Sequence, residues 1–126
     1  MGVSFEEHAG NRILVADYRG IVSPEEMVEV LHEYTDILRE SSERIDCLEL
    51  YEGSFGTAEF VSEGNRLGKE VHVHKIGLNA LVGVTGIKKV LLRTYLKFSG
   101  QKNVRTFDTK DEAVQWLCRQ QAAASA

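Results

Sequence analysis

Short apolar segments alternate with helical segments along almost the whole chain, and this alternation limits the available folds more than any other feature. Strand-like segments occur at residues 3–8 and 12–18, separated by a short turn, and again at residues 45–51, 78–84 and 104–107. A segment with helical periodicity follows each of the last four strands. Strands joined through helices pair in parallel, whereas a hairpin pairs antiparallel. The order ββαβαβαβα therefore predicts an α/β fold with a mixed, mostly parallel sheet.

Capping residues mark the expected starts of three of the four helices. Residues 23–26, Ser-Pro-Glu-Glu, combine an N-cap serine, a proline suited to the first helical position and a capping-box glutamate. Residues 109–112, Thr-Lys-Asp-Glu, form a second capping box. Thr57 is expected to cap a helix that ends near residue 69, and the remaining helix is expected over residues 87–99. Local sequence signals therefore indicate where three of the four predicted helices begin.

Length and composition fit one domain. The chain has 126 residues, of which 43% are hydrophobic and 27% are charged, as is usual for a globular domain. We expect a single domain over residues 1–121 and a flexible tail over residues 122–126.

The longest apolar run, residues 13–16, is far too short to span a bilayer, and the first residues match no targeting signal. Cys47 and Cys118 lack metal-ligand spacing, so we expect a cytoplasmic protein with reduced thiols.

Charge is distributed unevenly along the chain. Residues 1–63 contain 15 acidic and 4 basic residues, whereas residues 64–126 contain 4 acidic and 11 basic residues. A folded domain with this distribution can have one acidic and one basic side, which would attract a partner of opposite charge. The alternative is that the two groups of charges only keep the domain in solution.

Three local segments resemble those of a known superfamily. They are the stretch 17–20 (Asp-Tyr-Arg-Gly) before a capped helix, the loop 52–56 (Glu-Gly-Ser-Phe-Gly), and the ending in which residues 104–107 precede Glu112-Ala113 and Trp116-Leu117. With the order of elements, they resemble the STAS superfamily (sulfate transporter and anti-sigma factor antagonist), and specifically its SpoIIAA-like branch. The resemblance covers nearly the whole chain and rests on packing and turn features rather than on a catalytic motif.

The resemblance implies two kinds of function. Anti-sigma antagonists bind a protein partner and are switched by phosphorylation of a serine at the start of the second main helix, in an Asp-Ser-Ser-Gly-like loop. The corresponding loop here offers Ser54 and Thr57 as candidate phosphorylation sites but lacks the aspartate and the paired serines. SpoIIAA-like members resemble lipid-transfer domains, which implies a nonpolar ligand or a membrane surface. The departure from the phosphorylation motif favours this second function.

The third helix has more apolar residues than one buried face requires. One stripe at helical spacing consists of Ile87, Val90, Leu91, Tyr95 and Phe98. A second stripe, Leu92 and Leu96, is rotated away from it and must contact a neighbouring helix, a dimer partner, a ligand or a bilayer. With the preceding helix, the candidate ligand or partner contacts are Phe55, Phe60, Leu92, Tyr95 and Leu96. Cationic residues that suit an anion or an anionic membrane flank them, namely Lys88, Lys89, Arg93 and Lys97.

Other chemistries have weaker sequence support. His72 and His74 would lie on one side of an extended segment, but no further ligand completes a metal site, so solvated or partly buried histidines are expected. The acids Asp17 and Glu49 stand at strand positions and are expected to face water. The sequence contains no nucleophile–base motif, cofactor motif or base-stacking strand.

The sequence therefore predicts a non-catalytic binding domain with no cofactor, no metal and no nucleic-acid partner. Its second and third helices are expected to contact a nonpolar small molecule, an anionic membrane surface or a regulatory protein. A homodimer and a location at the membrane periphery are left open as alternatives to a cytoplasmic monomer. The first alternative is a phosphorylation-controlled regulator of a protein partner. The second is a small enzyme of unrecognised type.

Overall fold

A five-stranded sheet forms the centre of the fold. The structure, a computed structural model, describes residues 2–125, apart from the side chains of residues 87, 98, 99 and 125. The strands follow one another across the sheet in chain order: β1 (Val3–His8), β2 (Asn11–Asp17), β3 (Ile45–Leu50), β4 (Ile76–Val82) and β5 (Val104–Phe107). β1 pairs antiparallel with β2, and all other pairs are parallel. The predicted mixed, mostly parallel sheet is confirmed, with strand boundaries that differ from the expected ones by at most two residues.

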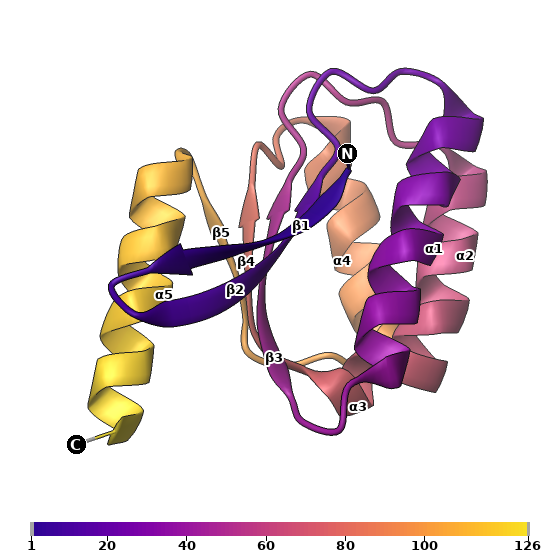
Figure 1. The fold of residues 1–126 in the computed structure, drawn as a ribbon. Helices are drawn as coiled ribbons and strands as arrows, with labels where there is room; N and C mark the ends of the chain where they lie inside the picture. The colour runs from indigo at the N-terminus through magenta and orange to yellow at the C-terminus, as the bar shows by residue number, and fades with distance from the viewer. Residues whose placement is uncertain (1, 126) are drawn as a thin grey trace.

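Helices cover both faces of the sheet (Figure 1). The helices α1 (Pro24–Glu40), α2 (Ala58–Leu67) and α4 (Ile87–Ser99) lie on one face, and α5 (Lys110–Ser125) lies on the other. Each of the three β-α-β connections moves one strand further across the sheet in the same direction. Because such connections are right-handed, their helices must lie on the same face. Two separate buried clusters result, one under α1 and α2 and one under α5.

The predicted helix caps are present in the structure. The hydroxyl oxygen of Ser23 accepts the backbone N–H of Glu26 at 3.3 Å, and that of Thr109 accepts the N–H of Glu112 at 3.2 Å. The hydroxyl of Thr57 accepts the N–H of Phe60 at 3.2 Å and so caps α2. These local contacts explain why the helices begin where the sequence predicts.

The second helix extends further than expected and changes its geometry. After α2 the chain continues as a π-helix, η1 (Gly68–His72), and then as a short helix, α3 (Val73–Lys75). Residues 72–74 are therefore not extended, and the condition under which His72 and His74 would share one side is not met. His72 is buried at 2% exposure, whereas His74 is exposed. Helical backbone places residues two apart on different sides.

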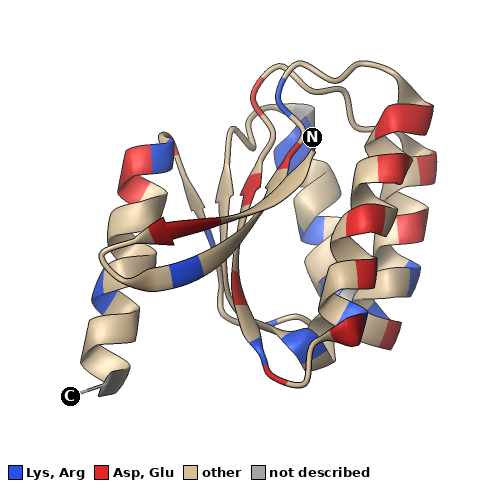
Figure 2. Cartoon of the chain, viewed as in Figure 1, with Lys and Arg blue, Asp and Glu red and all other residues tan. Residues whose placement is uncertain are grey.

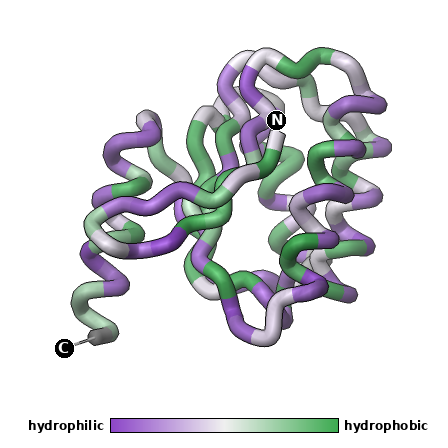
Figure 3. The backbone as a smooth tube through the Cα atoms, in the orientation of Figure 1, coloured by the Kyte–Doolittle hydropathy of each residue, from purple (hydrophilic) through white to green (hydrophobic). Residues whose placement is uncertain are grey.

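Hydrophobic residues run through the central strands and alternate with hydrophilic ones along α1 and α2 (Figure 3). Acidic residues lie along the outer side of these two helices, while the described Lys and Arg residues are spread over several elements (Figure 2). An acidic face is therefore formed, but the basic residues of the second half do not gather on one opposite side. At the C-terminus, the helical backbone of α5 continues through residues 122–125. The flexible tail over residues 122–126 stays a prediction.

Candidate ligand cavity

A cavity of about 80 Å³ lies between the sheet and the three helices on its first face. The strands β3, β4 and β5 form its floor, while α1, α2 and α4 form its walls. Most of its lining is apolar, and the hydrophobic side chains among the lining residues are Met27, Leu31, Phe60, Val61, Leu81, Val84, Leu91, Leu92 and Val104.

Helix α4 covers this cavity with an incompletely buried face. Lys88, Leu91, Leu92 and Tyr95 line the cavity, as residues three or four apart do on one helix face. None of the α4 side chains that the structure describes is buried, and α4 packs mainly against α2. Val90, expected in the first apolar stripe, is 52% exposed. Ile87 and Phe98, the two ends of that stripe, have side chains outside the described residues. The inward face of α4 thus combines members of both predicted stripes.

Glu49 is the acidic group at the polar end of the cavity. It lies on β3, the central strand, and its side chain points toward the helices rather than toward water. The expectation that Glu49 faces solvent is wrong, since it is only 8% exposed. The physical reason is that a central strand covered by helices on both faces has no solvated side. Burial raises the pKa of this carboxyl above its ordinary value, although its hydrogen bonds act in the opposite direction.

Three side chains donate hydrogen bonds to the Glu49 carboxylate. The hydroxyl of Tyr51 reaches Oε1 at 2.5 Å, while the hydroxyl of Tyr34 and the amide Nδ2 of Asn79 reach Oε2 at 3.0 and 2.8 Å. Asn79 is 1% exposed, and its Nδ2 also donates to Oε1 of Gln101 at 3.5 Å. Its Oδ1 atom is buried and accepts no hydrogen bond within the described part of the chain. The polar end is therefore rich in acceptors.

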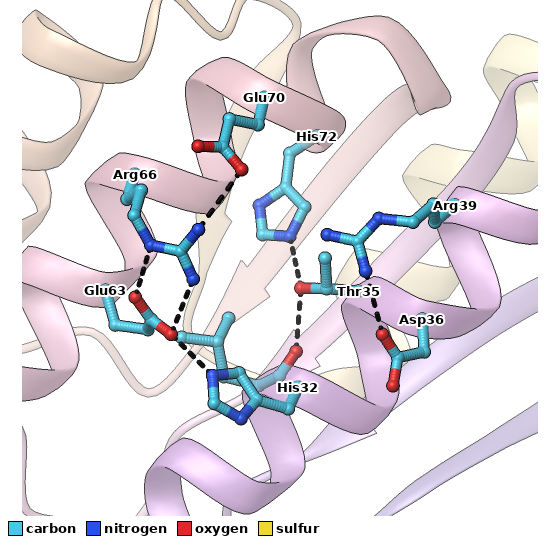
Figure 4. Close-up of polar contacts among 9 residues, drawn as sticks. His32, Thr35, Asp36, Arg39, Glu63, Arg66, Glu70 and His72 are labelled. Carbon is cyan, nitrogen blue, oxygen red and sulfur yellow. Dashed lines mark hydrogen bonds and ion pairs between the residues drawn. The ribbon is translucent and has the colours of Figure 1, made fainter.

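A chain of hydrogen bonds connects this polar end to His72 on η1. Gln101 donates to the hydroxyl of Tyr95, and Tyr95 lies 3.2 Å from Nδ1 of His72. On the other side of the ring, Nε2 lies 2.8 Å from the hydroxyl of Thr35 (Figure 4). Thr35 gives its own hydrogen to the carbonyl of Leu31 at 2.7 Å, so it must accept from Nε2 of His72. Nδ1 then carries no hydrogen and accepts from Tyr95.

His72 is held in its neutral form. Burial lowers its pKa from 6.5 to about 4, and the nearby positive charge of Arg39 acts in the same direction. The neutral ring satisfies both neighbours, because one nitrogen donates to Thr35 and the other accepts from Tyr95. His72 thereby links η1 to α1 and to α4, two of the helices that enclose the cavity.

A second polar cluster lies near the surface between α1 and α2 (Figure 4). Glu63 contacts His32 at 2.5 Å and Arg66 at 2.8 Å, and Arg66 also reaches Glu70 at 3.2 Å. The hydrogen bonds of Arg66, followed by that of His32, lower the pKa of Glu63 to about 2. Because these side chains are partly exposed, solvent screening limits their contribution to stability. They connect α1 to α2 outside the cavity.

The structure brings together some of the predicted contact residues. Phe60, Leu92 and Tyr95 line the cavity, whereas Leu96 is half-buried without being part of the lining. Phe55 is 62% exposed, in the loop that precedes α2.

The predicted cations and hydroxyl groups have different surroundings. Lys88 turns inward and donates to the backbone carbonyl of Tyr51 at 2.8 Å, while Lys89, Arg93 and Lys97 are exposed. Ser54 is buried, and its hydroxyl donates to the same carbonyl at 2.6 Å. Thr57 uses its hydroxyl oxygen to cap α2.

Sequence reasoning did not select the polar end, which consists of Tyr34, Glu49, Tyr51 and Asn79. The available signal was the strand over residues 45–50, in which the acid Glu49 stands between two leucines and which is followed by a tyrosine. Among residues 2–125, no three potential metal ligands lie together. Within the same range, no helix combines the length and the hydropathy that a membrane span requires.

Comparisons with known proteins agree with this architecture. A family model described as SpoIIAA-like matches residues 13–118. The structure is similar to the crystal structure of an uncharacterized protein with a SpoIIAA-like fold from Shewanella loihica PV-4. The two chains are 18% identical, the TM-score is 0.69 and the match covers 92% of each chain. At this identity the likeness concerns the fold alone. No curated protein matches the sequence.

Proposed function

The chain belongs to the SpoIIAA-like family, and from that premise we propose that it is a non-catalytic binding domain for a small, largely apolar molecule. The observation that carries the proposal is the apolar cavity beneath a helix whose inner face is only half-buried. A helix that covers a sheet normally buries its apolar stripe completely. The incomplete burial of α4 is what a covering helix shows when a ligand supplies the missing contacts.

The volume of the cavity limits the size of the ligand that it can hold. Its volume of about 80 Å³ is roughly half that of an engineered apolar cavity that binds benzene. A compact molecule of a few carbon atoms fits the cavity as it stands. A longer ligand requires α4 to move outward, and this movement disrupts few buried contacts because none of the described α4 side chains is buried.

The first prediction concerns ligand retention after native purification. Organic extracts of the wild-type protein are expected to contain one apolar compound at close to one equivalent, as measured by mass spectrometry. Leu92→Trp is expected to abolish its retention because the larger side chain fills the cavity. Val90→Trp is the matched control, since Val90 lies on the same helix but is exposed, and it is expected to retain the compound. Equal retention in both variants would place the ligand elsewhere. If the wild-type protein contained no extractable apolar compound and also bound no added one, the proposal would be contradicted.

The second prediction concerns the rival phosphorylation switch. Ser54 is buried with its hydroxyl bound to a backbone carbonyl, which supports ranking this function lower. Thr57→Ala is expected to lower the free energy of unfolding by about 1 kcal/mol through loss of the helix cap, with ligand retention unchanged. Ser54→Ala is likewise expected to leave retention unchanged. Chemical denaturation and the same extraction assay measure both effects. Stoichiometric phosphate on either residue in cells, with binding lost in a phosphomimetic variant, would reverse the ranking.

A further inference from the structure

At the polar end of the cavity, the side-chain hydrogen-bond donors around Glu49 are already engaged in hydrogen bonds within the protein. The hydroxyl groups of Tyr34 and Tyr51 each donate their single hydrogen to Glu49. Both hydrogens of the Asn79 amide are also engaged, one by Glu49 and one by Gln101. None of the three side chains that surround the carboxylate therefore has a hydrogen left for a ligand.

Acceptor capacity remains on two of these side chains, Asn79 and Glu49. The Oδ1 atom of Asn79 is buried and receives no hydrogen bond from the described residues. A carboxylate oxygen can accept two hydrogen bonds, and within the described part of the chain only Tyr51 donates to Oε1 of Glu49. A buried acceptor without a donor is costly, so this arrangement favours a ligand that supplies N–H or O–H groups.

Charge narrows the choice of head group. Among residues 2–125, no cation forms an ion pair with Glu49, and Lys88, the cation that lines the cavity, donates to the carbonyl of Tyr51. A buried carboxylate is strongly stabilised when a counter-charge with hydrogen-bond donors reaches it. An alcohol brings one donor and no charge, whereas an ammonium brings three donors and a positive charge.

We propose that the Glu49 and Asn79 end of the cavity recognises a primary amine, held as its ammonium ion, on a ligand whose carbon body occupies the apolar part. This inference rests on the proposed binding function and specifies the ligand class for that same cavity. The ammonium donates to Oε1 of Glu49 and to Oδ1 of Asn79. Ligands that carry only acceptors, such as carboxylates and phosphates, are disfavoured at this end.

Three probes with one branched carbon skeleton test the proposal: 3-methylbutylamine, 3-methylbutan-1-ol and 3-methylbutanoate. Each is titrated into the full chain at neutral pH, with dissociation constants taken from NMR shifts that include the side-chain amide of Asn79. The amine is expected to bind at least about tenfold more tightly than the alcohol, and the carboxylate is expected to bind most weakly. Because this comparison uses the wild-type protein, it does not depend on the folding of any variant.

Glu49→Gln removes the charge while it keeps the size of the side chain. In this variant the preference for the amine over the alcohol is expected to fall to about threefold or less, with the affinity for the alcohol largely kept. Glu59→Gln is the matched control, since Glu59 is exposed on α2, and it is expected to behave as the wild type.

The possible failures are distinguishable. Equal affinity for all three probes would show that the cavity binds apolar bodies without selecting the head group, which overturns this inference and leaves the proposed function standing. Tightest binding of the carboxylate would assign recognition to Lys88 and also overturn it. Failure of all three probes to bind, together with the absence of an extractable apolar compound, would contradict the proposed function itself.

Discussion

Acidification from neutral pH to pH 4 is expected to lower the free energy of unfolding of the wild-type chain by about 3 kcal/mol more than that of a His72→Gln variant. The pKa of His72 is about 4 in the folded protein and 6.5 in its ordinary state. As the pH falls below 6.5, the unfolded chain takes up a proton that the folded chain excludes. The stabilisation from His72 is therefore complete above pH 6.5 and is lost progressively toward pH 4.

The variant isolates this effect from the other titrating groups. Glutamine keeps an N–H donor for Thr35 but does not titrate in this range. The raised pKa of Glu49 acts in the opposite direction, because the folded state binds that proton more readily as the pH falls. The lowered pKa values of Glu6, Asp17 and Glu63 remove stability toward the acid end. These contributions are common to both proteins, so they cancel in the difference.

Urea unfolding at several pH values between 7 and 4 measures the difference. His74→Gln is the matched control, since His74 lies two residues further along the chain and is exposed, and its pH dependence is expected to follow the wild type. Parallel curves for the wild type and His72→Gln would show that His72 protonates as easily in the folded chain as in the unfolded one. The hydrogen-bond chain to Thr35 and Tyr95 would then not hold a neutral ring.

A second large effect is expected from Gly83→Ala, which should lower the free energy of unfolding by roughly 2–5 kcal/mol. Gly83 follows β4 with a φ of 82°, a backbone conformation that alanine rarely adopts. A Cβ atom at this position would also lie 2.7 Å from the backbone nitrogen of Glu52, in the loop after β3. Because backbone at a parallel strand end cannot move aside cheaply, both the strain and the clash remain.

Gly10→Ala separates these two causes. Gly10 has nearly the same φ, 81°, but a Cβ atom there would meet nothing within 4 Å. Its substitution is expected to cost roughly 1–2 kcal/mol from backbone strain alone. Thermal and chemical unfolding of both variants measure the difference, and equal destabilisation would show that the approach of Glu52 to Gly83 is not tight. Gly83 directly precedes Val84, which lines the cavity.

The elements themselves could be predicted because their signals are local. Apolar periodicity separates strands from helices, and the hydroxyl groups of Ser23, Thr57 and Thr109 fix helix starts through contacts only three residues away. The family followed from the same order of elements, and the match over residues 13–118 confirms it. The sequence alone thus determined the order of the elements and the mostly parallel sheet. The order of the strands across the sheet, and with it which helices share a face, came from the structure.

The polar end of the cavity was decided by tertiary structure. Alternation along a strand tells which residues share a side, but it does not tell which side is dry, and here helices cover both. Glu49 was therefore expected in water and is instead buried among hydrogen-bond donors from α1, β4 and the chain just after β3. His72 is buried at the end of a π-helix, and no local pattern in the sequence signalled this helix geometry. Local sequence fixes backbone geometry over a few residues, whereas the burial of a polar group depends on every element that packs against it.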